Sequence, residues 1–450
     1  MPLRQQILLS YQQKALKSTM KKTNTEKLHL KKNNTEIQNL QKKKKETATP
    51  INPGENKEKK DKQMLRIITI ITLSIFFAHT KAQEIKNNMP IYINNMLQQH
   101  TYTLDPNNYK NTQKWKKAAK KQLLQATKLP IPDTTLTYHI TDTQQRQGYK
   151  IHKINYTLSA WNQGKAYLLI PDSCKKAPAI LMLHDHGAHF TIGKEKLARP
   201  FNTDTTIIKD AQIWVKKYYN NTFLADHYAQ KGYVVLVADA LLWGERQAEG
   251  GTQHSQQQAI AIGMMQIGYS LGGMMLHDDL RTLQLLCSLP CVDLERVGCL
   301  GFSMGAYRAW MLSAATTQIK ATAAICWMTT TKHQLTPPMK PKGNSDYNTI
   351  IPALAQKLDY PHIAALTSPR PLLLFNGTKD KLFPIEGVKQ AYQIIENIYK
   401  KDKATHNLNQ QLWDTTHTFT KEQQQATLQF FQQHLQTPEN NQNPNTTTTH

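Results

Sequence analysis

The sequence predicts a three-layer α/β fold, in which helices cover both faces of a doubly wound, mostly parallel sheet. Three observations support this fold. Short, nearly continuous apolar runs recur along the chain, helical stretches separate them, and one run leads directly into Gly-x-Ser-x-Gly at residues 301–305. Such runs are typical of strands buried on both faces of a parallel sheet, because the connecting helices cover both sides. With 450 residues, the chain can form one large domain with extensions.

The expected elements follow in chain order. Residues 109–128 place Trp115 and Leu123 on one face at helical spacing, which predicts an amphipathic helix packed on the domain. Residues 151–158 and 166–170 are typical of an antiparallel pair that opens the sheet. We expect the central strands at residues 179–183, 233–238, 297–301, 321–327 and 371–376, with helices at 222–231, 276–288 and 386–400.

The first 82 residues differ in composition from the rest of the chain. Residues 1–63 carry 16 Lys and Arg against 6 Asp and Glu and few apolar side chains, which predicts a disordered basic extension. Residues 64–82 combine a basic start, an apolar core and a terminal alanine, as a signal peptide does, and the core is too short for a stable membrane anchor. A signal peptide normally begins a chain. We therefore hypothesise that translation starts at Met64 and that the mature protein is periplasmic or secreted.

The remaining sequence divides into an N-terminal helical segment (83–130), the α/β domain (131–435) and a disordered tail (436–450). Within the domain, residues 328–360 form a polar, proline-containing excursion that we expect to rim the site. Residues 1–82 contribute half of the net charge of +24. The other half is scattered over the rest of the chain, without an aromatic-basic motif. This distribution does not favour a nucleic-acid partner.

Five cysteines are spread through the chain, and an odd number leaves at least one thiol free. Cys287 and Cys291 are close enough in sequence for a disulfide to form, and the sequence leaves this pairing open. None of the five lies in a pattern typical of a catalytic cysteine.

The Gly-x-Ser-x-Gly motif predicts a serine nucleophile at Ser303, on a sharp turn between a strand and a helix. Gly301 and Gly305 satisfy the need for small neighbours at this strained turn. A second match places Ser270 between Gly268 and Gly272, but its preceding residues lack the β-branched content of a buried strand. We therefore favour Ser303 and interpret Ser270 as a serine that leads into a helix.

A serine nucleophile needs a histidine base and an acid that orients it, in the chain order Ser, Asp or Glu, His for this type of fold. Asp380 follows the strand at 371–376, and His417 precedes an expected final helix. Asp414 competes with Asp380, but a position only three residues before His417 is poor for contacting the far side of the imidazole. We expect Asp380 to be the acid.

The oxyanion needs backbone N–H donors from two places. We expect the Met304 N–H, at the start of the helix after Ser303, and an N–H near Ala188, where Gly187 permits close backbone approach. His184 and His186 stand at alternate positions, a spacing that two ligands of one metal ion can have. We disfavour a metal site here because no further cluster of ligands completes the coordination.

These motifs together resemble the α/β-hydrolases of the dienelactone hydrolase and acetyl xylan esterase type. The resemblance implies an esterase that needs no metal or cofactor, with Ser303 as nucleophile, Asp380 as acid and His417 as base. It also places Glu245 and Arg246 near the carboxyl edge of the sheet, where they either shape the acyl or sugar pocket or pair with each other. The matching segments cover residues 183–187, 239–246, 292–297, 301–305, 368–371, 377–384 and 417–419.

We therefore expect an exported serine esterase that forms an acyl-enzyme and deacetylates a carbohydrate ester. A serine peptidase of the prolyl-oligopeptidase type is the nearest alternative, but only about 50 residues lie between Gln83 and the first core strands, too few for the large additional domain of such enzymes. A non-catalytic binding protein on a hydrolase scaffold is a further alternative. The sequence does not indicate an oligomeric state.

Overall fold

The computed structural model describes residues 89–132, 134–335 and 347–436, which lie within one compact unit, Asn87–His450. The predicted basic extension (1–63), the signal peptide (64–82) and the tail beyond residue 436 fall outside the described residues.

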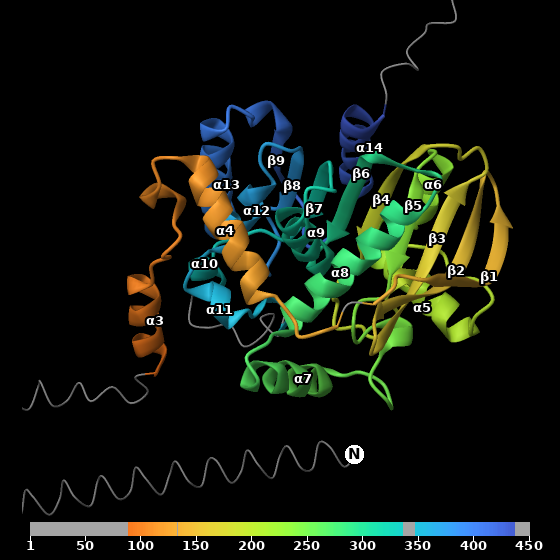
Figure 1. Cartoon of the computed structure of the whole chain (residues 1–450), viewed down its shortest axis with the longest axis horizontal. Helices are drawn as coiled ribbons and strands as arrows, with labels where there is room; N and C mark the ends of the chain where they lie inside the picture. Colours follow the sequence, from red (N-terminus) through yellow and green to blue (C-terminus); the bar gives the residue numbers. More distant parts are fainter. Residues whose placement is uncertain (1–88, 133, 336–346, 437–450) are drawn as a thin grey trace, which may run out of the picture. The chain divides into compact units, whose positions relative to one another are not determined.

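The described residues form one nine-stranded sheet in the order β1-β2-β3-β5-β4-β6-β7-β8-β9 (Figure 1). β1, β2 and β3 are antiparallel, β3 also pairs antiparallel with β5, and the strands from β4 to β9 run parallel. The predicted fold class is confirmed. The strands are β1 Tyr138–Arg146, β2 Tyr149–Ser159, β3 Asn162–Pro171, β4 Ala177–Leu183, β5 Val234–Ala238, β6 Val292–Phe302, β7 Ala321–Ile325, β8 Leu372–Gly377 and β9 Leu408–Trp413.

Helices cover both faces of this sheet (Figure 1). On β4, Leu181 and Leu183 pack into the core on one face, whereas Ile180 and Met182 pack into the core on the other. Successive side chains of a strand point to opposite faces, so a strand between two cores must be apolar throughout. The first face is covered by α4 (Thr112–Ala126), α8 (Leu271–Ser288), α9 (Met304–Ala315) and α13 (Ile385–Lys401), the second by α5 (Thr205–Tyr218), α6 (Leu224–Gln230) and α14 (Lys421–Leu435).

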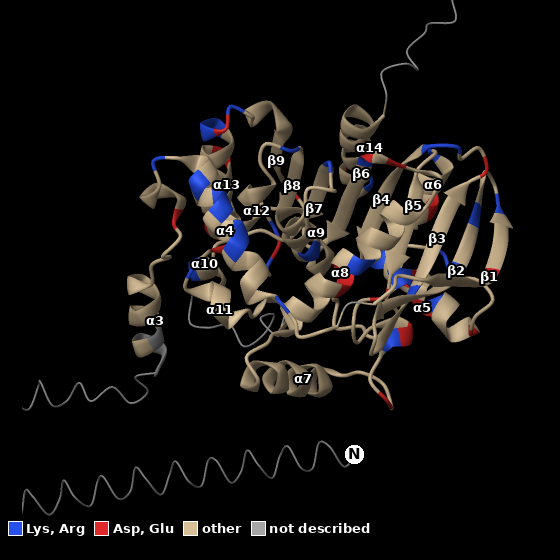
Figure 2. Cartoon of the chain, in the orientation of Figure 1, with Lys and Arg blue, Asp and Glu red and all other residues tan. Residues whose placement is uncertain are grey.

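The amphipathic helix predicted before the sheet is α4. Its buried residues are Trp115, Ala119 and Leu123, which belong to the same core as the sheet and α9. Figure 2 shows its lysines gathered along the helix surface. Asn111 caps its N-terminus by accepting a hydrogen bond from the Lys114 N–H. α4 thus packs against the core of the sheet, whereas the described side chains of α3 (Met89–Gln99) are mostly exposed.

Several elements were not predicted, among them α5 and α7 (His254–Gln266), which both contribute to the cavity at Ser303. α7 contains no charged residue (Figure 2). Ala261 on this helix packs in a small separate cluster with Phe190, Trp243 and Met304. The other short elements are α3 Met89–Gln99, α10 Thr331–Leu335, α11 Pro352–Ala355, α12 Tyr360–Ala364, and the 3₁₀ turns η1 Pro106–Asn108, η2 Lys194–Lys196, η3 Gly244–Arg246, η4 Tyr347–Thr349, η5 Ala365–Thr367 and η6 Thr405–Asn407.

Across the part of the chain that the structure describes, no single helix has both the length and the apolar composition needed to cross a membrane. The pair α7 and α8, taken together across a 95° bend, meets that criterion by length and composition alone.

Candidate active site

Ser303 lies on a strained turn between β6 and α9. Its backbone has φ 55° and ψ −123°, a region that residues with a side chain rarely adopt. Two glycines allow this turn. A Cβ on Gly301 would lie 2.0 Å from the Gly305 carbonyl oxygen, and a Cβ on Gly305 would lie 1.8 Å from the Leu183 carbonyl oxygen. The turn therefore places the Ser303 hydroxyl at the carboxyl end of the parallel strands.

Ser303, His417 and Asp380 form a continuous chain of hydrogen bonds. The His417 Nε2 atom lies 2.8 Å from the Ser303 Oγ atom, and its Nδ1 atom lies 2.6 Å from an oxygen of Asp380. With Nδ1 donating to the carboxylate, Nε2 is left to accept the serine proton. The other Asp380 oxygen accepts the Leu382 N–H at 2.9 Å, and the Asp380 side chain is fully buried. The Phe302 ring packs against the imidazole, with 5.0 Å between the ring centroids.

The two competing residues lie in other environments. Ser270 is the N-cap of α8, where its buried hydroxyl accepts the Gly273 N–H at 3.0 Å. Asp414 is exposed and forms an ion pair with Lys379 at 2.8 Å. The structure thus brings Asp380, rather than Asp414, to His417.

Gly187 and Ala188 lie where the oxyanion loop was expected, at the end of β4. Both have positive φ, 58° and 53°, and both line the cavity that contains Ser303. The Ala188 N–H, however, donates to the Nδ1 atom of His186 at 2.9 Å. This local bond differs from the expectation of an N–H available to substrate. Met304 is the first residue of α9, where the backbone N–H has no acceptor within the helix.

Glu245 and Arg246 do not line this cavity, and they do not pair with each other. Glu245 forms an ion pair with the buried Lys194 at 2.7 Å. Arg246 is buried, donates to Asp278 at 2.6 Å and to the Asp239 carbonyl oxygen. Both expectations for this pair are therefore corrected, because Glu245 pairs with the buried Lys194 and Arg246 with the half-buried Asp278, partners that the sequence pattern did not indicate.

The cavity at Ser303 has a volume of about 350 Å³ and mostly aromatic walls. Trp214 comes from α5 and His254 from α7, two helices that were not predicted, and Gln334 comes from the predicted excursion at 328–360. The lining residues are Asp185, His186, Gly187, Ala188, Trp214, Tyr218, His254, Phe302, Ser303, Trp327, Gln334, Leu382, Phe383 and His417.

The histidines after β4 make hydrogen bonds rather than a chelating pair. The His184 Nδ1 atom lies 2.9 Å from the Asp185 carbonyl oxygen, and its Nε2 atom accepts the Ala240 N–H at 3.0 Å. The His186 Nε2 atom lies 3.1 Å from the Gln257 side-chain oxygen. Since both nitrogens of His184 are engaged, this arrangement does not favour the metal site considered above.

All five cysteines are free thiols, so Cys287 and Cys291 are not joined in this structure. Cys326 is buried beside the site, and its sulfur and the ligand atoms of Asp380 and His417 lie within 4.8 Å of one another. Burial, and secondarily the nearby Asp380, raise the pKa of the Cys326 thiol. A neutral thiol is a weak metal ligand and a weak nucleophile.

Burial of His184 predicts a loss of stability in acid. Burial, with a smaller effect from the nearby Lys196 and Arg308, holds the pKa of His184 well below its ordinary value. Below about pH 6.5 the unfolded chain takes up a proton that the folded chain does not, so the free energy of unfolding falls as the pH falls. The contribution of this residue is at most about 1.4 kcal/mol per pH unit. Urea unfolding at pH 7 and pH 5 should give a smaller pH effect in His184→Gln than in the wild type, and equal effects would contradict the prediction.

Comparison with known proteins agrees with this fold. A family model described as the Abhydrolase family matches residues 89–432. The chain belongs to this family. The predicted resemblance to α/β-hydrolases is therefore confirmed, although the matched segment begins well before the predicted domain boundary at residue 131.

Individual relatives of this hydrolase are distant. YtaP of Bacillus subtilis (strain 168), provisionally named a hydrolase, is 25% identical over 257 residues, which is 57% of this chain and 78% of the relative. A Bacteroides fragilis protein, provisionally named an acetyl xylan esterase, superposes with a TM-score of 0.57 at 20% identity, over 72% of this chain and 81% of that one. The glucuronoyl esterase of Solibacter usitatus superposes with a TM-score of 0.50 at 15% identity, over 71% and 91% of the two chains. At these identities, the solved structures show the shared fold.

Proposed function

We propose that this hydrolase is an exported serine esterase that removes acetyl or another small acyl group from a carbohydrate ester. The observation that carries the proposal is the hydrogen-bonded chain from Ser303 through His417 to Asp380, at 2.8 and 2.6 Å. An imidazole that bridges a serine hydroxyl and a buried carboxylate is the arrangement that activates serine as a nucleophile.

In the proposed reaction, His417 Nε2 takes the Ser303 proton as Oγ attacks the ester carbonyl carbon. Asp380 stabilises the imidazolium that forms, and N–H groups of Met304 and of the Gly187–Ala188 turn bind the oxyanion. The tetrahedral intermediate collapses, and His417 donates its proton to the leaving alkoxide, which leaves an acyl group on Ser303. His417 then deprotonates a water that attacks this acyl-enzyme, and its proton returns to Ser303 as the carboxylic acid leaves.

The walls and volume of the cavity at Ser303 support the proposal of a small acyl group. Phe302, Trp327 and Phe383 enclose part of a cavity of about 350 Å³ around Ser303. The carbohydrate part of the proposal draws on the names of the structural neighbours, an acetyl xylan esterase and a glucuronoyl esterase. Export rests on the predicted signal peptide at residues 64–82.

The proposal is tested with the purified full chain on three kinds of substrate. We expect hydrolysis of p-nitrophenyl acetate and of a peracetylated xylo-oligosaccharide, with rates that fall as the acyl chain of the aryl ester lengthens. We expect no cleavage of aminoacyl-p-nitroanilides. Cleavage of the anilides with no hydrolysis of either ester would replace the proposal with the peptidase alternative. A folded protein that is inert towards all three and towards fluorophosphonate labelling of Ser303 would favour a binding protein.

A further inference from the structure

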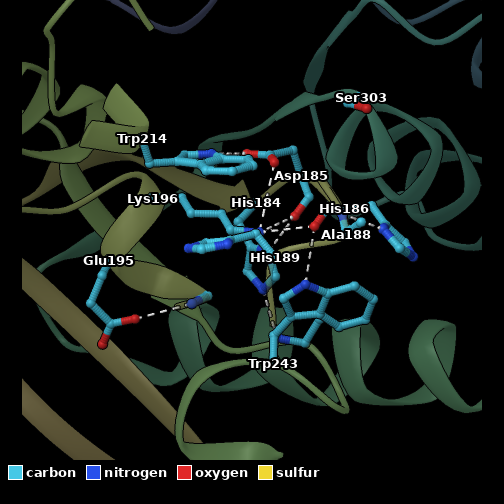
Figure 3. Close-up of polar contacts among 12 residues, drawn as sticks. His184, Asp185, His186, Ala188, His189, Glu195, Lys196, Trp214, Trp243 and Ser303 are labelled. Atoms are coloured by element: carbon cyan, nitrogen blue, oxygen red, sulfur yellow. Dashed lines mark hydrogen bonds and ion pairs between the residues drawn. The ribbon is translucent and has the colours of Figure 1, made fainter. Parts of the chain in front are cut away.

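The loop after β4 is held by a lysine that solvent does not reach. Lys196 is the last residue of η2, and its side chain is 0% exposed. Its Nζ atom donates to the carbonyl oxygens of Asp185 and His186, both at 3.0 Å (Figure 3). Burial of a lysine is costly unless its hydrogen-bonding groups find partners. The partners of Lys196 are two successive carbonyls of the loop that continues into Gly187 and Ala188.

The remaining surroundings of this lysine suit an ammonium ion. The Asp185 carboxylate lies 3.7 Å from Nζ, and the Trp214 ring lies 4.8 Å from it, within cation–π range. The Asp185 carboxylate in turn accepts a hydrogen bond from Trp214 Nε1 at 3.2 Å (Figure 3). It also accepts one from the Tyr219 hydroxyl at 2.6 Å. Lys196 is therefore fixed by a network whose own members are hydrogen-bonded.

These contacts determine how the peptide between His186 and Gly187 is oriented. The His186 carbonyl accepts from Lys196 and also from Trp243 Nε1, at 3.2 Å. In a trans peptide the N–H points opposite to the carbonyl, so the Gly187 N–H points away from Lys196. Gly187 lines the cavity with Ser303, and within the described ranges its N–H has no hydrogen-bond acceptor.

The loop needs such support because its conformation is unfavourable by itself. Gly187 and Ala188 have successive positive φ values, and this costs about 1 kcal/mol or more for a residue with a Cβ. Gly187 also packs tightly, since a Cβ there would lie 2.2 Å from the Trp214 ring. The Ala188 N–H is already bonded to His186, so the Gly187 N–H is the donor on this turn that remains available.

We propose that Lys196 is a positioning residue of the oxyanion hole, an inference that rests on the proposed esterase function. Its ammonium fixes the His186–Gly187 peptide so that the Gly187 N–H, together with the Met304 N–H, binds the oxyanion. A cation on the carbonyl also polarises the peptide, which strengthens its N–H as a donor. Preorganised donors of this kind lower the energy of the tetrahedral intermediate rather than that of the bound substrate.

Lys194 provides a matched control. It lies in the same turn η2, and its side chain is 1% exposed. Its Nζ atom contacts carboxylates instead of the loop, at 2.8 Å from Asp239, 2.8 Å from Glu195 and 2.7 Å from Glu245. Substitution of either lysine removes a buried cation, but only substitution of Lys196 releases the loop carbonyls.

The test compares Lys196→Met and Lys194→Met in the full chain, with thermal unfolding used to correct for the folded fraction. For p-nitrophenyl acetate, we expect Lys196→Met to lower kcat by about tenfold to a hundredfold with little change in KM. It should weaken inhibition by an aryl trifluoromethyl ketone, which forms an oxyanion on Ser303, by a similar factor. Lys194→Met should retain both values per folded molecule. A folded Lys196→Met with wild-type kcat and ketone affinity would overturn the inference.

Two further measurements cover the cases in which this comparison fails. If Lys196→Met does not fold, Trp243→Phe removes the second donor to the His186 carbonyl and should lower kcat without raising KM, whereas an unchanged kcat would overturn the inference. If the wild type hydrolyses no ester, the proposed function fails, and the positioning role is read from amide exchange instead. Faster exchange in residues 183–190 of Lys196→Met, and not of Lys194→Met, would support that role, and unchanged exchange would refute it.

Discussion

Ser303→Ala is expected to reduce the hydrolysis of p-nitrophenyl acetate by at least about 10⁴-fold in kcat. The substitution removes the atom that forms the acyl-enzyme, while the His417–Asp380 pair and the cavity remain in place. Stability should change little, because the Ser303 side chain accepts no capping hydrogen bond from the first turn of α9. Steady-state rates measured at equal folded concentration, with denaturant unfolding of both proteins, test this expectation.

Ser270→Ala is the matched control, since each of the two serines lies at the centre of a Gly-x-Ser-x-Gly motif. The structure gives Ser270 a capping role at α8, so its loss should cost about 1 kcal/mol of stability and leave kcat unchanged. The two variants therefore have opposite expected profiles, one with lost activity and the other with lost stability. Full activity in Ser303→Ala would exclude the proposed mechanism, whichever result Ser270→Ala gives.

The central part of the fold was predictable because its strands are buried on both faces. β4, β5, β7, β8 and the second half of β6 are apolar runs, and the sequence located each of them. β1 and β9 were missed because they are edge strands with mostly polar sequences, such as Asn-Gln-Gln in β9. An edge strand has one neighbour and partial exposure to solvent, so its composition carries a weak signal.

The missed helices have similar explanations. α7 buries only Gln257 and Ala261, so no apolar stripe marks it in the sequence. On α5, the exposed Ile213 interrupts the apolar periodicity that Ala211 and Val215 would otherwise define. Both helices contribute to the cavity, through His254 and Trp214. The sequence therefore predicted the three residues that the structure joins by hydrogen bonds, Ser303, His417 and Asp380, but not most of the cavity walls.

Local motifs and long-range contacts explain this difference. Ser303 and its glycines form one contiguous turn, whose steric requirements appear directly in the sequence. By contrast, the partners of Glu245 and Arg246 are Lys194 and Asp278, each more than 30 residues away. No spacing rule connects charges that distant, so only the folded chain reveals that this pair is structural.

Asp380→Asn is expected to lower kcat by about 10²- to 10⁴-fold while Ser303 and His417 are intact. An amide keeps the shape of the carboxylate and can still accept the Leu382 N–H. It can also donate to the His417 Nδ1 atom, which would place the imidazole proton on Nε2 and prevent that atom from accepting the serine proton. The amide also lacks the charge that stabilises the imidazolium. We expect KM to change little, because Asp380 does not line the cavity.

Asp414→Asn separates this role from a general effect of removing a carboxylate near His417. The Asp414 side chain is 76% exposed and pairs with Lys379, which is itself exposed. Such surface ion pairs contribute at most about 1 kcal/mol, so this variant should have wild-type kcat and nearly wild-type stability. If Asp414→Asn lost activity and Asp380→Asn retained it, the acid would be the residue close to His417 in sequence, and the 2.6 Å contact of Asp380 would have no role in the reaction. The expected opposite result would mean that the buried carboxylate at the end of β8 orients the base, because burial fixes both its position and the imidazole tautomer that it selects.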